Sequence, residues 1–212
     1  MVSTPIKLNT VAVSLLLVLC TEWLAWWGMG RFDLSPMTVV GGVRLIQIAI
    51  LVWLVSSFEG GLNTIGWAVS EWPAGLKKGA VWSMGFGVAT AVAMILIYMT
   101  GRNPLEMIKS PLPDSTLETL LFFAVGGFIA PVAEELCFRG ILYSFFRRWG
   151  MLAAITASTA IFVALHAVRG IPFTQIVGGI VFAVAYETSG NLMVPITIHC
   201  LANLAIFSLS LV

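Results

Sequence analysis

Residues 131–140 read PVAEELCFRG and place Glu134, Glu135 and Arg139 within strongly apolar sequence. Charged side chains at membrane depth are costly, and they mark functional sites by default. In a helix, Glu135 and Arg139 lie four residues apart on one face and can form an ion pair. Glu134 is turned away from that face by about 100° and has no basic partner nearby in the sequence. This pattern predicts a structural role for the Glu135–Arg139 pair and a general-base role for Glu134.

Two further four-residue spacings, each containing a histidine, lie in the same half of the chain. The sequence contains two histidines, His166 and His199, and both lie in apolar runs. Phe162 and His166 are four residues apart, and so are His199 and Asn203. A side-chain amide beside an imidazole supplies donors for a developing oxyanion. A lone histidine on an apolar face is more often structural, but two histidines with a nearby carboxylate pair favour a functional site.

The remaining ionisable and thiol groups in apolar runs have simpler interpretations. Glu22 and Arg44 are expected to snorkel or to pair between helices, and Glu187 completes the set of intramembrane ionisable residues. Cys20, Cys137 and Cys200 are interpreted as small buried hydrophobic residues, with no disulfide framework. Cys200 points about 100° away from its neighbour His199, which disfavours a Cys–His nucleophile.

The composition is that of a membrane protein. Of the 212 residues, 59% are hydrophobic and 10% are charged, and the mean hydropathy is +0.99. An average soluble domain has about 25% charged residues. The net charge is +1 and the lysines and arginines are scattered, so nothing indicates nucleic-acid binding. The expected surroundings are a lipid bilayer.

Seven apolar runs predict an all-α, polytopic transmembrane helix bundle with about seven spans and an intramembrane catalytic cavity. A membrane span needs about 20 residues. We expect one integral membrane domain, 1–212, with an N-terminal three-helix half, 1–100, and a C-terminal catalytic half, 117–212. The first run is interpreted as an uncleaved span, because it is long and rich in tryptophan. The runs are 8–28, 37–58, 80–99, 117–146, 150–168, 174–187 and 192–211.

Two features leave the geometry open. Residues 100–116 are the most polar and proline-rich segment, and they form either a plain connecting loop or a gate above the cavity. Measured from the helix edge at 147–148, Glu134 lies at a depth of about 20 Å and His166 at about 25 Å. Measured from Asn191, His199 lies at about 12 Å. Tilt or a short sixth helix must bring these groups together.

The three motifs in this order resemble the CPBP family of intramembrane proteases. That family contains type II CAAX prenyl endopeptidases and bacterial relatives linked to bacteriocin self-immunity. Its pattern is Glu-Glu-x-x-x-Arg, then Phe-x-x-x-His, then His-x-x-x-Asn. The segment 188–199 adds a family-like T-x-G-N-L-x-x-P-I-x-x-H approach to the last motif. The resemblance covers residues 118–205 and implies intramembrane cleavage of a peptide bond in a membrane-anchored or lipidated protein or peptide.

The resemblance also implies roles for individual residues. Glu134, helped by His166, would activate a water, and His199 with Asn203 would hold the oxyanion. The supporting residues would be Phe162 and the Glu135–Arg139 pair, with Arg139 also facing substrate. The prenyl endopeptidases of this family have a further helix after His-x-x-x-Asn, whereas this sequence ends nine residues after Asn203, which leaves the cavity wall and substrate type open. The short chain without appended domains indicates a bacterial cytoplasmic membrane protein.

Several alternatives stand beside this interpretation. Glu134, His166 and His199 would make three ligands of a catalytic zinc site, although the sequence has no H-E-x-x-H motif and a metal-free site is favoured. A non-catalytic membrane immunity or scaffold factor of the same fold is the alternative function. A proton-coupled transporter is disfavoured, because the ionisable groups crowd into one half and no repeat is visible. The sequence does not specify an oligomeric state.

Overall fold

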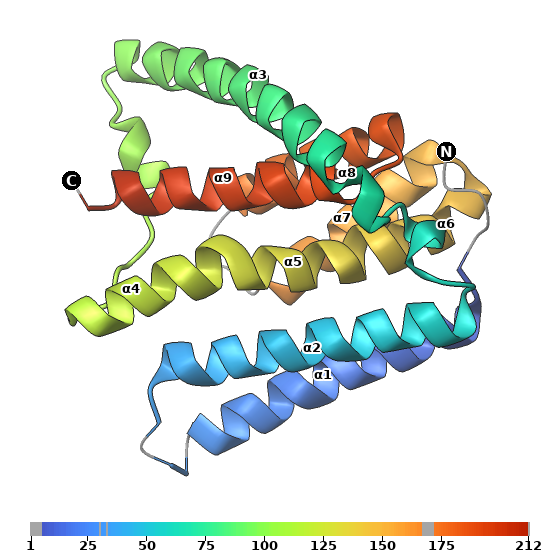
Figure 1. Cartoon of the computed structure of the whole chain (residues 1–212). Helices are drawn as coiled ribbons and strands as arrows, with labels where there is room; N and C mark the ends of the chain where they lie inside the picture. Colours follow the sequence, from blue (N-terminus) through green and yellow to red (C-terminus); the bar gives the residue numbers. More distant parts are fainter. Residues whose placement is uncertain (1–5, 30, 33, 167–171, 212) are drawn as a thin grey trace.

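The structure is a computed structural model that describes residues 6–29, 31–32, 34–166 and 172–211. Within these ranges the chain is helical and has no strand (Figure 1). One long helix, Thr116–Trp149, is built from six consecutive segments. These are α4 (Thr116–Ala124), η4 (Val125–Ile129), α5 (Ala130–Glu135), η5 (Leu136–Tyr143), α6 (Ser144–Phe146) and η6 (Arg147–Trp149). The other helices are α1 (Leu8–Met29), α2 (Pro36–Phe58), α3 (Trp72–Met99), α7 (Met151–Leu165), α8 (Phe173–Ser189) and α9 (Met193–Leu209).

The helices confirm the predicted all-α membrane bundle. Each of the seven predicted runs carries a helix in the described residues, although residues 167 and 168 of the fifth run lie outside them. Four stretches are long and apolar enough to cross a membrane, namely Leu8–Met29, Pro36–Phe58, Leu62–Met99 and Thr116–Trp149. The helices α7, α8 and α9 have 15, 17 and 17 residues. The chain is therefore an integral membrane protein with helices of unequal length.

One predicted boundary was wrong. The third run was expected to start at residue 80, but α3 begins at Trp72. The glycines and lysines of 72–79 resemble a loop in sequence, yet Pro73 occupies the first turn of the helix, where its missing N–H costs nothing. The glycines of this turn serve helix packing, as described below.

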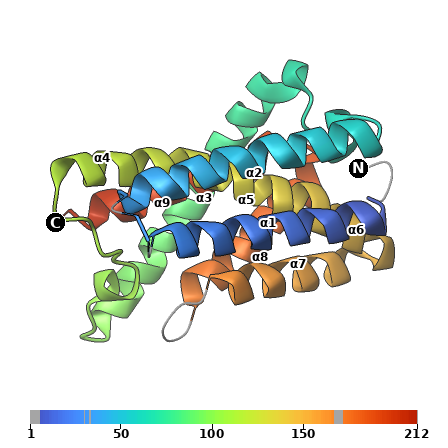
Figure 2. The same cartoon turned by 90° about the horizontal axis from the view of Figure 1, so that it is seen from below.

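The long helix lies at the centre of the bundle. Helix α2 packs on α5, α7 packs on η5, and α9 packs on α5 and η4. Figure 2 shows α7 and α8 on one flank of this central helix and α2 on another. Because η5 contains the fully buried residues Leu136, Ile141 and Leu142, the main hydrophobic core surrounds the segment that follows Glu135.

Helices α1 and α2 are joined by a polar cluster inside the membrane-spanning region. Arg44 forms an ion pair with Glu22, and Gln47 donates to Thr21 and Glu22 at 2.9 Å each. Gln47 is only 3% exposed. The predicted helix-to-helix pairing of Glu22 and Arg44 is confirmed, and each charge has a polar partner across the interface.

Helix α3 crosses α9 through glycines. A Cβ atom at Gly75 would lie 2.6 Å from Met193, and one at Gly79 would lie 2.5 Å from Thr197. Such close approach of two backbones is characteristic of small residues in membrane helices. Beyond this crossing α3 diverges from α9, so that the two helices form a V in Figure 1.

The connection that follows α3 returns to the end of α9. It includes a short 3₁₀ turn, Pro104–Met107, and the Ser110 backbone N–H donates to the Ser210 hydroxyl at 3.0 Å. The segment is thus attached to the helix that carries His199. The prediction that residues 100–116 form a plain loop or a gate stays open, since this contact is compatible with either.

The glycine crossing yields a stability prediction. We expect Gly79→Ala to lower the free energy of unfolding by about 1–3 kcal/mol, because its Cβ would overlap Thr197. Thermal unfolding in detergent measures the loss. Gly85→Ala on the same helix is the control, because a Cβ there meets nothing within 4 Å. Equal stability of the two variants would contradict the tight crossing.

Candidate active site

Glu135 joins two elements of the site through a single oxygen. Its Oε1 accepts from Arg139 at 2.9 Å and from His199 Nδ1 at 2.8 Å. The side chains of Glu135 and Arg139 are both 0% exposed. The pair expected from the i, i+4 spacing is present, although Leu136–Tyr143 is π-helical. The bond to His199 was not anticipated, and it makes Glu135 the residue that orients this imidazole.

Arg139 extends the same buried network to α8. It donates to the Gly179 carbonyl at 3.0 Å, and α7 packs closely there, because a Cβ at Gly179 would lie 2.6 Å from Thr159. Arg139 has no exposed side-chain surface and is not among the residues that line the cavity described below. The expectation that Arg139 also faces substrate is therefore wrong for this structure.

Glu134 meets both histidines. Its Oε2 lies 3.7 Å from His166 Nε2 and 3.8 Å from His199 Nε2. These separations are too long for direct hydrogen bonds, and a bridging water would suit them. Helix α7 has 15 residues and spans about 22 Å, which brings His166 at its end to the depth of Glu134. His199 reaches the same point, because its Nε2 lies 3.8 Å from Glu134, although its depth estimated from the sequence was smaller.

Hydrogen bonds at Nδ1 fix the orientation of both imidazoles and the nitrogen that carries the proton. His166 Nδ1 lies 2.7 Å from the Phe162 carbonyl, which can only accept. His199 Nδ1 faces Glu135, whose carboxylate is paired with Arg139 and also accepts. Each Nδ1 therefore carries a proton, and each Nε2 is directed at Glu134. The ring of Phe162 also contacts the ring of His166, with centroids 4.2 Å apart.

Asn203 is held by a backbone carbonyl group that Pro131 leaves without a helical hydrogen bond. In the π-helical segment Val125–Ile129 the N–H of Ala130 bonds to the Val125 carbonyl, so the next bond would run from residue 131 to Gly126. Proline has no N–H, and the Gly126 carbonyl instead accepts from Asn203 Nδ2 at 2.8 Å. The PVAEE motif thereby fixes the position of the amide on α9.

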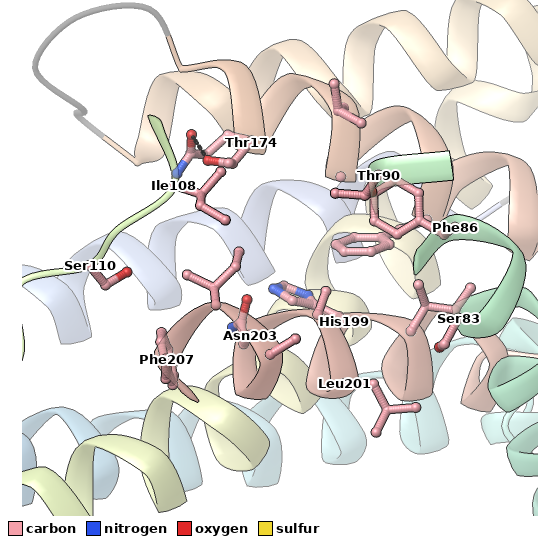
Figure 3. A pocket seen from close by; sticks show the side chains of 18 of the residues that line it. Ser83, Phe86, Thr90, Ile108, Ser110, Thr174, His199, Leu201, Asn203 and Phe207 are labelled. Atoms are coloured by element: carbon pink, nitrogen blue, oxygen red, sulfur yellow. Dashed lines mark hydrogen bonds between the residues drawn. The ribbon is translucent and has the colours of Figure 1, made fainter. Parts of the chain in front are cut away.

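A cavity of about 600 Å³ lies between α3, α8 and α9. Glu134, Phe162, His166, His199 and Asn203 all line it. Figure 3 shows His199 and Asn203 projecting from α9 into the same space. The structure thus collects the five cavity-facing site residues predicted from the sequence, while the Glu135–Arg139 pair supports them from the protein interior.

Phe182 is a site residue that sequence reasoning missed. Its ring stacks on His199 with centroids 4.6 Å apart and an interplanar angle of 25°. The Arg139 guanidinium lies 5.3 Å from the centre of the same ring. No spacing motif marks Phe182, although it follows by three residues the glycine that accepts from Arg139. Another intramembrane residue, Glu187, lies elsewhere and pairs with Arg147 at 2.8 Å.

The thiols and the metal question complete the site. Cys137 and Cys200 are buried, as predicted, but Cys20 is exposed on α1, so its interpretation as a buried residue was wrong. A residue in an apolar run can face lipid, and composition alone does not give its face.

Among the described residues, no group of three or more His, Cys, Asp or Glu side chains is arranged to hold a metal ion. Zinc binding by Glu134, His166 and His199 stays a prediction, which the chelation experiment below tests.

The buried ion pair yields a second prediction. We expect Arg139→Met to lower the free energy of unfolding by about 3–5 kcal/mol, because Glu135 would lose its cation inside the protein. Thermal unfolding in detergent would measure the effect. Removing the charge of Glu135 as well, in Glu135→Gln/Arg139→Met, should restore part of the stability.

The partly exposed Arg147–Glu187 pair provides the matched control. Its side chains are 37% and 18% exposed, so Arg147→Met should cost no more than about 1 kcal/mol. A loss as large as that of Arg139→Met would show that burial of the Glu135–Arg139 pair is not what makes it important.

Comparison with known proteins agrees with the motifs. Residues 116–205 match the family described as type II CAAX prenyl endopeptidase Rce1-like. The chain is also similar to an uncharacterized 24.3 kDa protein of Escherichia coli, with 29% identity over 136 residues. That alignment covers 57% of the chain and 59% of the relative, so the chain spans less than two thirds of the relative's length. No solved structure matches the chain. The matched residues, 116–205, carry all three motifs, so the similarity to the CAAX protease family lies in the C-terminal part of the chain.

Proposed function

We propose that the protein is an intramembrane endopeptidase that hydrolyses a peptide bond with a water activated by Glu134. The observation that carries this proposal is the placement of Glu134 Oε2 within 3.8 Å of two imidazole Nε2 atoms at the cavity surface. The match of residues 116–205 to a protease family supports peptide-bond hydrolysis. The substrate class is a membrane-embedded or lipidated protein or peptide, and the proposed location is the bacterial cytoplasmic membrane.

The first step is attack by water. A water between Glu134 and His166 donates one proton to the Glu134 carboxylate and a hydrogen bond to His166 Nε2. Its oxygen forms a bond to the scissile carbonyl carbon, and the carbonyl oxygen becomes an oxyanion. The Phe162 carbonyl holds the proton of His166 on Nδ1, so that Nε2 is available to accept. General-base assistance of this kind contributes about 10²–10⁴ in rate.

The second step is stabilisation and collapse of the tetrahedral intermediate. Asn203 uses one N–H on the Gly126 carbonyl and has a second for the oxyanion. His199 donates to the oxyanion when Nε2 carries a proton, and the ionised Glu135 at Nδ1 balances the added charge. As the C–N bond breaks, protonated Glu134 returns its proton to the leaving amine nitrogen, which regenerates the carboxylate.

The central test is Glu134→Gln, which keeps the shape of the side chain and removes the base. We expect cleavage of quenched fluorescent peptides, prenylated and unprenylated, to fall by about 10³ or more. The assay uses purified protein in detergent, with Glu22→Gln as the control for loss of a membrane carboxylate. Equal turnover by wild type and Glu134→Gln would refute the proposed base.

A chelator arm of the same assay addresses zinc. Survival of wild-type cleavage after exhaustive chelation would support the metal-free route. Loss of cleavage that added zinc restores would instead assign Glu134, His166 and His199 to a metal, in a geometry different from the one described. If no peptide is cleaved and Glu134→Gln keeps the cellular effect of the protein, a non-catalytic membrane immunity or scaffold role replaces the protease.

Asn203 gives an independent test of oxyanion stabilisation. We expect Asn203→Ala to lower kcat by about 10²–10³ with a smaller change in KM, because the lost donor acts mainly in the transition state. Steady-state kinetics measure the split, and thermal unfolding checks that loss of the Gly126 hydrogen bond has not unfolded the site. A rise in KM alone, at constant kcat, would argue against this role.

A further inference from the structure

Small residues occupy every fourth position along most of α3. They are Gly75, Gly79, Ser83, Gly87 and Ala91. The first two form the tight crossing with α9. Rows of residues four apart are inclined to the helix axis, so the small-residue row turns gradually away from α9 as α3 proceeds. The last three residues leave that interface and line the cavity.

This second part of the row, the Ser83–Gly87–Ala91 face, has no helix packed on it among the described residues. A Cβ atom at Gly87 would meet nothing within 4 Å, and Ala91 is exposed. The Ser83 hydroxyl donates to the Gly79 carbonyl of its own helix at 2.8 Å, so this face offers little unsatisfied polarity. Figure 3 shows Ser83 on the α3 side of the cavity, with His199 and Asn203 across from it.

The chemistry of the bilayer favours a helix over a lipid chain as the partner of this face. Small residues in membrane helices allow two backbones to approach closely. A flexible acyl or prenyl chain fits around large side chains and needs no such row. Because the same row already packs against a helix at Gly75 and Gly79, its continuation is suited to a second helix.

A separate observation points to a ligand in the same space. His199 is 5% exposed and lines the cavity. Its Nδ1 is bonded to Glu135, but its Nε2 is 3.8 Å from Glu134, beyond hydrogen-bond distance. This Nε2 has no hydrogen-bond partner among the described residues, and a substrate peptide group or a water in the cavity would supply one.

We propose that the Ser83–Gly87–Ala91 face docks a transmembrane helix of the substrate protein. The docked helix would lie along α3, and the chain leaving it would enter the cavity beside Glu134. This inference rests on the proposed protease function and specifies its substrate as a membrane-spanning protein.

The test measures docking separately from cleavage. The probe is a synthetic single-span peptide with a leucine-rich core of about 20 residues, one Gly-x-x-x-Gly pair and a photo-crosslinking residue at its centre. It is reconstituted in liposomes with the full-length Glu134→Gln variant, which prevents loss of the peptide by cleavage. Gly87→Leu is then compared with Gly85→Leu, because a Cβ at either glycine meets nothing within 4 Å and only Gly87 lines the cavity.

We expect crosslinks to map to α3, and Gly87→Leu to weaken the apparent affinity at least about tenfold while Gly85→Leu matches the parent. Equal crosslinking in the two variants would overturn the proposal. So would crosslinks that map away from α3, displacement of the peptide by a prenylated peptide alone, or crosslinks between two copies of the protein through α3. Failure of the protease proposal would appear differently, as equal cleavage by wild type and Glu134→Gln.

Discussion

The arrangement of the site depends on one buried carboxylate, that of Glu135. Its Oε1 accepts from both Arg139 and His199, and neither partner of the ion pair has exposed side-chain surface. Without Arg139 this carboxylate would be an uncompensated charge inside a membrane protein, and without Glu135 the guanidinium would be. Separating the two side chains would leave a buried charge without a partner, and this cost in free energy holds the pair together. The hydrogen bond from His199 Nδ1 to Glu135 fixes the imidazole to this pair. The hydrogen bond from Arg139 to the Gly179 carbonyl fixes the pair to the backbone of α8.

A second constraint works through the backbone of the same helix. Pro131 cannot donate, so one carbonyl of the π-helical turn is left for Asn203. Mid-helix π turns are often found at functional sites, and here the reason is specific. The irregular turn supplies the acceptor that orients the amide, while the glycines of the turn let α9 approach, since a Cβ at Gly127 would lie 2.6 Å from Leu204. Two short-range features of one helix thus position both His199 and Asn203.

Local spacing predicted the parts of the site that lie on one helix. The Glu135–Arg139 pair follows from four-residue spacing, as do the shared faces of Phe162 with His166 and of His199 with Asn203. Contacts between distant segments could not be read in this way. Glu135 and His199 are 64 residues apart, and Phe182 belongs to no motif, so only the packing of α8 and α9 on the central helix reveals them. The start of α3 was misplaced because glycines that pack helices together resemble glycines that break them.

The same ambiguity explains why α3 is informative. In a water-soluble protein, glycines on an unpacked helix face only lower the stability of the helix. In a bilayer the hydrophobic effect does not drive helices together, and close backbone approach has to do so. Gly75 and Gly79 have this partner in α9, whereas their continuation along the cavity has none in the described part of the chain. Under the docking proposal, the Ser83–Gly87–Ala91 face contacts a helix only when substrate binds, and the candidate base lies in the cavity beside it.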